Sequence, residues 1–210
     1  MFPEKHDMKI KNQCPWEKES IMQKKLGCLI VAALLLAASL AFGADNITPQ
    51  TGGVFPAVEL SKPTDAGHLK YLGLSGGGNF KLNEIKADVL IVEIFSMYCP
   101  YCQGEAPNIN RLYQSIQNDA ALKSRVKIIG IGIGNSKFET EIFKNKYNVA
   151  FPLIPDGEFK MHKVIGEVRT PYFFVIKLKG KKPMEVIYSK LGALESNESF
   201  LALIKSAGLK

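Results

Sequence analysis

The chain has 210 residues, of which 46% are hydrophobic and 22% are charged. This length and composition are typical of one globular domain with additional segments, and they indicate no particular function. The formal net charge is +7, from 27 basic and 20 acidic residues. The lysines are scattered and form no stripe interleaved with aromatic residues. We therefore interpret the charge as a solvated basic surface and expect no nucleic-acid partner.

An apolar segment near the N-terminus predicts export. Residues 26–42, LGCLIVAALLLAASLAF, carry no charge, follow Lys24 and Lys25, and precede Gly43. A positive flank, an apolar middle and small residues at the exit are typical of a secretory signal peptide. An uncleaved membrane anchor is the alternative, because about 17 apolar residues lie at the lower limit for spanning a bilayer. Both alternatives place the rest of the chain in the periplasm or facing the outside.

The boundaries of the chain's parts follow from this segment. Residues 1–21 are polar, whereas Met22 would begin a signal peptide of ordinary length, so we hypothesise that translation starts at Met22. Residues 1–43 are then an N-terminal extension with a signal peptide or anchor, and membrane contact is expected only through this part if it is not cleaved. Residues 44–54 are predicted to be an exposed lead-in, and residues 55–210 to form the folded domain.

Apolar runs and helical periodicities alternate through the folded domain. Strands are predicted at residues 89–95, 126–133, 171–176 and 184–189. Helices are predicted at residues 102–118, 136–145 and 196–207, with a turn at 155–157 and a short helix towards residue 165. Ser136 is the expected cap of the second helix. Strands interleaved with helices predict an α/β fold with a mixed central sheet.

The stretch 96–107, SMYCPYCQGEAP, holds two cysteines separated by two residues. A structural disulfide usually closes a longer loop, because the entropy removed from the unfolded chain grows with loop length. A zinc site needs four ligands, whereas the chain after residue 43 offers this pair and two histidines, His68 and His162. We therefore expect no metal, and the motif favours a reactive dithiol.

The predicted strand-to-helix layout favours a thiolate at Cys99. At the start of a helix this side chain faces unpaired backbone N–H groups and the positive helix end, which lower a thiol pKa from about 8.5. Pro100 suits the first helical position because its missing N–H is not needed there. Cys99 is therefore the predicted nucleophile, and Cys102, one turn deeper, is predicted to resolve the mixed disulfide.

These motifs resemble the thioredoxin superfamily. That family has an acidic residue six positions before the first cysteine and a proline five positions after the second, and Glu93 and Pro107 stand there. Gly192 begins a Gly-Ala-Leu stretch similar to the family's turn before its last helix. The family's cis-proline, near the cysteines in space, corresponds to Pro171, which follows Thr170.

The resemblance implies a thioredoxin-like fold over about residues 55–210. The chain is longer than the minimal fold needs, and a helix and strand inserted at about residues 136–155 would lie between the active-site helix and the cis-proline strand. Together with the export segment, this insertion resembles the exported TlpA-like or redoxin-type branch.

The resemblance also implies roles for site residues. Glu93 would be a buried carboxylate that shuttles protons to Cys102, the alternative being an edge-strand residue that faces water. Pro171 would be cis and leave the Thr170 backbone free to pair with an extended substrate, the alternative being a trans proline that opens a strand. Tyr98 and Tyr101, on either side of the first cysteine, either pack against the domain or shape the rim that accepts the substrate.

The implied function is thiol–disulfide exchange with protein substrates, with the dithiol as redox carrier and no metal or organic cofactor. A reductant that receives electrons from a membrane partner is the expectation. A disulfide-inserting oxidant and a thiol peroxidase are the alternatives of the same fold. Ser96 lies three residues before Cys99, as in peroxiredoxins, but Val92 stands where those enzymes have a proline. The alternative of another class is a redox-inert polypeptide-binding module, against which the intact cysteine pair argues.

Overall fold

The structure is a computed structural model that describes residues 47–178 and 183–209. The predicted signal peptide or anchor, the hypothesised start at Met22 and the boundary at residue 43 lie outside the described residues. Within the described part of the chain, no helix is both long enough and apolar enough to cross a bilayer.

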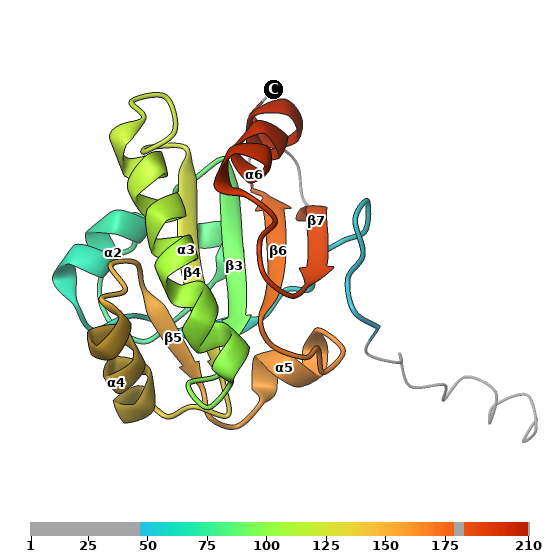
Figure 1. The fold of residues 1–210 in the computed structure, drawn as a ribbon. Coiled ribbons are helices and arrows are strands. Elements are labelled where there is room, and N and C mark those ends of the chain that lie inside the picture. The colour runs from blue at the N-terminus through green and yellow to red at the C-terminus, as the bar shows by residue number, and fades with distance from the viewer. Residues whose placement is uncertain (1–46, 179–182, 210) are drawn as a thin grey trace, which may run out of the picture. The chain divides into compact units, whose positions relative to one another are not determined.

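A five-stranded mixed sheet in the order β5-β4-β3-β6-β7 forms the centre of the domain (Figure 1). Its strands are β3 (Val89–Phe95), β4 (Val126–Ile133), β5 (Leu153–Asp156), β6 (Tyr172–Lys177) and β7 (Glu185–Leu191). Strand β3 pairs in parallel with β4 and antiparallel with β6, so it is the central strand. Every residue of β3 and β4 is buried, as the apolar β-branched runs predicted.

Two apolar cores lie on the two faces of this sheet, because successive side chains of a strand point to opposite faces. The helices are α2 (Ala66–Leu72), α3 (Pro100–Asn118), α4 (Lys137–Tyr147), α5 (Lys160–Val164) and α6 (Asn197–Leu203). Helices α3, α4 and α6 contribute to one core, together with Ile91 and Phe173 of the sheet. Helices α2 and α5 contribute to the other core, together with Leu90 and Phe174.

The predicted insertion is present between α3 and β6 as α4 and β5. Ser136 caps α4 as predicted: its Oγ accepts a hydrogen bond from the Glu139 N–H at 3.3 Å, and Glu139 Oε2 accepts one from the Ser136 N–H at 2.7 Å. The turn predicted at residues 155–157 is wrong in part, because Pro155 and Asp156 belong to β5. A proline is tolerated there because β5 lies at the edge of the sheet.

The segment before β3 is more ordered than its composition predicted. Residues 47–54 are mostly exposed, but their backbone is tied to β7: the Gly52 N–H donates to the Val186 carbonyl at 2.8 Å, and the Val186 N–H donates to the Gly53 carbonyl at 2.9 Å. Beyond it, β1 (Glu59–Ser61) and β2 (Asn79–Lys81) form a second, antiparallel sheet. Neither these strands nor α2 was predicted: the strands have three residues each, and the seven residues of α2 give little periodic signal.

Candidate active site

The two cysteines lie where the central strand passes into the longest helix. Strand β3 ends at Phe95, and α3 begins at Pro100 after a short loop. Cys99 is the residue before the helix, with extended φ and ψ of −83° and 115°, and Pro100 occupies the first helical position as predicted. Both cysteines are free thiols in the structure. The strand-to-helix junction therefore presents Cys99 at the helix end and places Cys102 in the first turn.

Cys99 is partly exposed and lies against Thr170. Its Sγ is 3.4 Å from the Thr170 carbonyl oxygen. Partial burial acts to raise the pKa of the Cys99 thiol, but hydrogen bonds with the Thr170 side chain and with the backbone N–H groups of Cys102 and Tyr101 outweigh it. The pKa of Cys99 is therefore lower than that of an ordinary thiol, as the sequence predicted.

Cys102 is completely buried beneath the first cysteine. Burial raises the pKa of the Cys102 thiol well above its ordinary value, and the negative charge of Glu93 raises it further. The pKa values of the two thiols are therefore shifted in opposite directions, down for Cys99 and up for Cys102. Cys99 suits attack on a disulfide, and Cys102 is held as a protonated thiol until a base removes its proton.

Glu93 lies on the central strand, with 2% of its surface exposed. The edge-strand alternative is therefore wrong. Burial, together with the charge of Glu105, raises the pKa of Glu93 to about 8. Within the described residues, Glu93 Oε1 has no hydrogen-bond partner. A carboxyl group in this state exchanges its proton near neutral pH.

Glu105 was missed by the sequence analysis. It lies in α3 three residues after Cys102, is buried, and its Oε1 accepts hydrogen bonds from the Leu194 N–H at 3.2 Å and from Asn108 Nδ2 at 2.9 Å. A signal was available, because positions 102, 105, 109, 112 and 116 form one stripe of the helix. A carboxylate on an otherwise apolar stripe that begins at a cysteine indicates a functional position.

Asn135 was also missed. It is completely buried after β4, and its Oδ1 accepts a hydrogen bond from the Met97 N–H at 2.8 Å. Gln103 holds the same loop from the other side, since its Nε2 donates to the Met97 carbonyl at 2.8 Å. The loop that presents Cys99 is therefore fixed by residues from two neighbouring elements.

The predicted proline and glycine meet beside the cysteines. The peptide bond between Thr170 and Pro171 is cis. The Gly192 N–H donates to the Pro171 carbonyl at 2.9 Å, and Gly192 has a φ of 98°, which favours glycine. Pro107 lies inside α3, which continues past it to Asn118.

Two grooves flank Thr170. We call the first, of about 690 Å³, the α3 groove; its lining includes Pro100, Tyr101, Glu105, Pro171 and Gly192. We call the second, of about 540 Å³, the α5 groove; its lining includes Ser96, Tyr98, Gly134, Phe159 and His162. Arg169 and Thr170 line both grooves. The structure therefore brings together the predicted substrate-binding residues Tyr98, Pro100, Tyr101 and Thr170 around Cys99.

The two tyrosines beside Cys99 are on the surface, with 65% of Tyr98 and 79% of Tyr101 exposed. The packing alternative is therefore wrong for both, and they stand at the rims of the two grooves. The Tyr98 hydroxyl donates a hydrogen bond to Glu139 of α4, so this side chain is held in place by the insertion.

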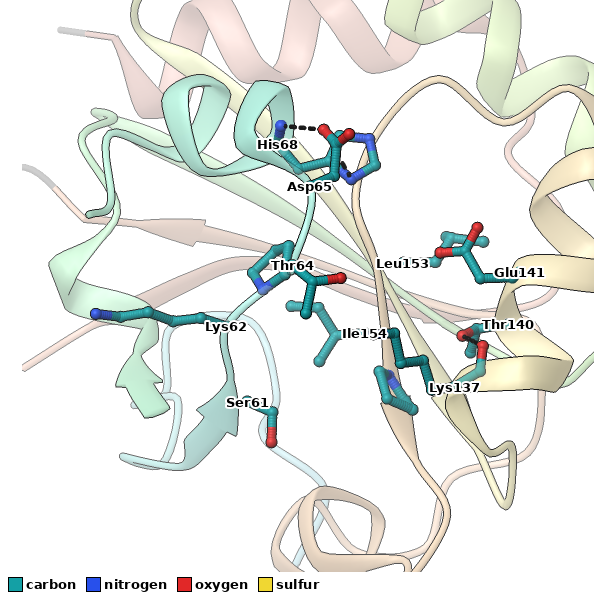
Figure 2. Close-up of a pocket in the computed structure, with 12 residues that line it drawn as sticks. Ser61, Lys62, Thr64, Asp65, His68, Lys137, Thr140, Glu141, Leu153 and Ile154 are labelled. Carbon is teal, nitrogen blue, oxygen red and sulfur yellow. Dashed lines mark hydrogen bonds and ion pairs between the residues drawn. The ribbon is translucent and has the colours of Figure 1, made fainter. Parts of the chain in front are cut away.

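A third pocket lies away from the cysteines, between α2, α4 and β5 (Figure 2). It has a volume of about 310 Å³, and His68 and Asp65 face each other at one end of it, where Asp65 Oδ1 accepts a hydrogen bond from the His68 N–H at 2.7 Å. Its lining includes neither a cysteine nor any predicted site residue, so it is not the candidate redox site.

A family model described as the AhpC/TSA family matches residues 55–181. The chain is 25% identical over 105 residues to the thiol-disulfide oxidoreductase ResA of Geobacillus thermodenitrificans, covering 50% of this chain and 58% of that protein. It is 24% identical over 161 residues to ResA of Bacillus subtilis, covering 76% of this chain and 84% of that protein. The first of these matches thus spans less than two thirds of the relative's length.

Solved structures are similar as well. A thiol:disulfide interchange protein, DsbE, of Chlorobium tepidum matches with a TM-score of 0.58 at 16% identity, covering 76% of this chain and 99% of that chain. The thioredoxin domain of a thiol-disulfide oxidoreductase from Bacteroides vulgatus matches with a TM-score of 0.54 at 15% identity, covering 75% and 99%. At these identities the likeness concerns the fold alone, and it confirms the predicted thioredoxin-like fold.

Proposed function

The chain belongs to the AhpC/TSA family, and on this premise we propose that it is an exported thiol–disulfide oxidoreductase that exchanges disulfides with protein substrates through Cys99 and Cys102. One observation supports the proposal above all others: Cys99 is partly exposed at the start of α3, with its Sγ 3.4 Å from the Thr170 carbonyl oxygen, whereas Cys102 is buried in the first turn. These surroundings lower the pKa of Cys99 and raise that of Cys102. The names of the relatives, thiol-disulfide oxidoreductase ResA, agree with it.

The reductant reaction has two steps. The Cys99 thiolate attacks one sulfur of a substrate disulfide; a mixed disulfide forms, and the other substrate sulfur leaves as a thiolate and takes a proton from solvent. Cys102 then loses its proton and attacks Cys99 Sγ, which releases the second substrate sulfur. The substrate has gained two electrons, and the enzyme now holds the Cys99–Cys102 disulfide.

Glu93 is the proposed proton acceptor for the second step. The pKa of Cys102 is raised by burial and by the charge of Glu93, so the thiol does not ionise by itself near neutral pH. The Glu93 carboxylate, with a pKa of about 8, is the proposed acceptor because it is buried and near enough for its charge to raise the pKa of Cys102.

Thr170 and the two grooves are the proposed binding site for the substrate chain. Thr170 lines both grooves and its carbonyl contacts Cys99 Sγ, so a polypeptide that reaches Cys99 lies against Thr170. The dithiol carries the two electrons, so the proposal includes no metal or organic cofactor. The export segment at residues 26–42 supports a location in the periplasm, where a membrane electron donor would reduce the Cys99–Cys102 disulfide.

Insulin reduction in the presence of dithiothreitol tests the exchange reaction. We expect the wild-type protein to accelerate it and Cys99→Ser to be inactive. Equal rates for the two proteins would contradict the proposed enzymatic function and favour a redox-inert binding module. The direction is tested by the reduction potential of the dithiol in glutathione and dithiothreitol buffers. A reduction potential of about −270 mV would support a reductant, and one of about −120 mV would indicate that the protein inserts disulfides.

A further inference from the structure

Phe159 has a backbone conformation that is unfavourable for a bulky residue. Its φ and ψ are 59° and 26°, in the left-handed region, where a side chain with a Cβ meets the following carbonyl group. Among the described residues, three that are not glycine have positive φ. Asn148 is the C-cap of α4, where asparagine is common. The other two, Phe159 and Glu167, both line the α5 groove.

The surrounding backbone holds Phe159 in this conformation. Its N–H donates to the Asp156 carbonyl at 3.1 Å, and its own carbonyl accepts from the Lys163 N–H at 3.0 Å. The buried Asp156 carboxylate accepts hydrogen bonds from the N–H groups of Met161 and His162, at 3.2 and 3.0 Å. The direction of the Phe159 side chain is therefore set by the loop, and unfavourable residues held in this way concentrate at functional sites.

The ring of Phe159 lies on the backbone of Gly134. A Cβ added to Gly134 would come within 2.7 Å of the ring carbon Cζ, so only glycine allows the ring to lie there. The centroids of the Phe159 and His162 rings are 5.8 Å apart. Despite these contacts, 41% of Phe159 remains exposed. Because Phe159 lines the α5 groove, the exposed part of its ring presents an apolar surface to the groove.

The α5 groove is continuous with the redox site. Ser96, Tyr98 and Thr170 line it, and the Thr170 carbonyl lies 3.4 Å from Cys99 Sγ. A substrate chain whose cysteine reaches Cys99 beside Thr170 therefore has flanking residues that enter this groove. The exposed charged residues of the lining, Glu167 and Arg169, have opposite signs, so the groove does not select its occupant by net charge.

We propose that Phe159 is a specificity residue, which binds an aromatic or branched aliphatic side chain close to the reacting cysteine of an extended substrate. This rests on the proposed function, because the occupant is the polypeptide whose disulfide reacts with Cys99. The contact is one of apolar surfaces, in which a flat ring at the groove stacks on or packs against the substrate side chain. Substrates with small or charged side chains at that position react more slowly.

Single-turnover kinetics of the reduced full-length protein test the proposal. The substrates are short peptides with one cysteine, capped as a mixed disulfide with 2-mercaptoethanol, and with either phenylalanine or alanine at one of the two positions on each side of it. We expect the phenylalanine peptide to react about fivefold faster than the alanine peptide at one position at least. In Phe159→Gly, and in Phe159→Asn, this ratio should fall to about one. Both residues tolerate positive φ, so both variants keep the loop conformation.

The ratio is measured within each variant, so a general loss of activity or of folded protein cancels. Phe138→Ala is the matched control, because Phe138 is 75% exposed on α4 and does not line the groove; it should keep the wild-type ratio. A wild-type ratio of one at all positions, or a ratio that persists in both Phe159 variants, overturns the specificity role. A wild-type protein that reduces neither the peptides nor 2-hydroxyethyl disulfide overturns the proposed reductant instead, so the two failures are distinguishable.

Discussion

The α3 groove and the α5 groove share Arg169 and Thr170 but are otherwise built from different parts of the chain. The α3 groove is formed by the first turn of α3, Pro171 and the turn at Gly192, which are the segments that carry the motifs. The α5 groove takes Gly134 and Phe159 from the loops on either side of the inserted α4 and β5. We infer that the residues of the α3 groove serve the redox chemistry and that the α5 groove selects the substrate, so changes at the two grooves should affect different measurements.

The largest effect is expected in the first turn of α3, beside the α3 groove, for Cys102→Ser. This variant can still form the mixed disulfide at Cys99 but has no thiol to release the substrate. Turnover of insulin should fall below about one thousandth of the wild-type rate, while the first, stoichiometric reaction persists. Mass spectrometry should detect the protein linked to one peptide chain. A variant that turns over at more than one tenth of the wild-type rate would contradict the assigned order of the two cysteines.

Glu93→Gln should slow the second step by about a hundredfold, because it removes the proposed proton acceptor. In the wild type, release of the substrate should accelerate as the pH rises through about 8, where Glu93 becomes a carboxylate. The variant should lack this rise. Measurement of release rates from pH 6 to pH 9.5 checks both points, and a wild-type profile that persists in the variant would contradict the role of Glu93.

The same substitution should stabilise the fold at neutral and higher pH. The folded-state pKa of Glu93, about 8, is above its unfolded value, so the folded protein retains a proton that the unfolded chain has lost. The Glu93 carboxyl group therefore lowers the free energy of unfolding progressively as the pH rises from about 4 to about 8. Above about pH 8 this loss stays constant, at up to about 5 kcal/mol. Urea unfolding at pH 5 and pH 8 should show a gain for Glu93→Gln that is larger at pH 8. A gain of equal size at both values would mean that the carboxyl group is not protonated in the folded protein.

Alanine substitution at one glycine in each groove compares the packing of the two grooves. Gly192 of the α3 groove and Gly134 of the α5 groove both have positive φ, but an added Cβ meets no atom within 4 Å at Gly192 and meets the Phe159 ring at Gly134. Gly192→Ala should therefore lower the free energy of unfolding by about 1.5 kcal/mol, from backbone strain alone. Gly134→Ala should lower it by about 3 kcal/mol, because the ring must also move.

The double variant isolates the contribution of the ring. In a Phe159→Gly background, Gly134→Ala should lose its additional effect and fall to about 1.5 kcal/mol, as at Gly192. Chemical denaturation of the four variants measures this. If Gly134→Ala remains equally destabilising without the ring, the strain at Gly134 is in the backbone and the contact with Phe159 contributes nothing.

The elements and site residues that could be predicted from sequence are those with local or motif-based signals. Strands β3 and β4 follow from β-branched apolar runs, which are typical of strands buried on both faces. Cys99 follows from the spacing of the cysteine motif, and Pro171 from its place after Arg169 and Thr170 and before an aromatic strand, as the resemblance implied. Phe159 and Asn135 gave no such signal. The role of Asn135 depends on a hydrogen bond from Met97, 38 residues away in sequence. The left-handed conformation of Phe159 is rare for a bulky residue, so the sequence does not predict it.

Strand β5 shows how a local signal is overridden. A Pro-Asp-Gly sequence usually forms a turn, yet Pro155 and Asp156 continue the pairing with β4 because the missing N–H of the proline faces away from the sheet at an edge strand. The turn follows at Gly157 and leads to Phe159. The position of the α5 groove is thus set by the end of an edge strand, which depends on tertiary pairing and not on the local sequence.

The smallest effect is expected at the two tyrosines of the rims. The Tyr98 hydroxyl donates to Glu139 and so links the Cys99 loop to the inserted helix α4, whereas the Tyr101 hydroxyl makes no hydrogen bond among the described residues. Tyr98→Phe should lower the phenylalanine-over-alanine preference of the peptide assay by less than about threefold, because an exposed hydrogen bond contributes little. Tyr101→Phe, at the other groove, should leave the preference unchanged. If Tyr101→Phe had the larger effect, the substrate side chain would bind in the α3 groove, and the assignment of substrate selection to the α5 groove would be wrong.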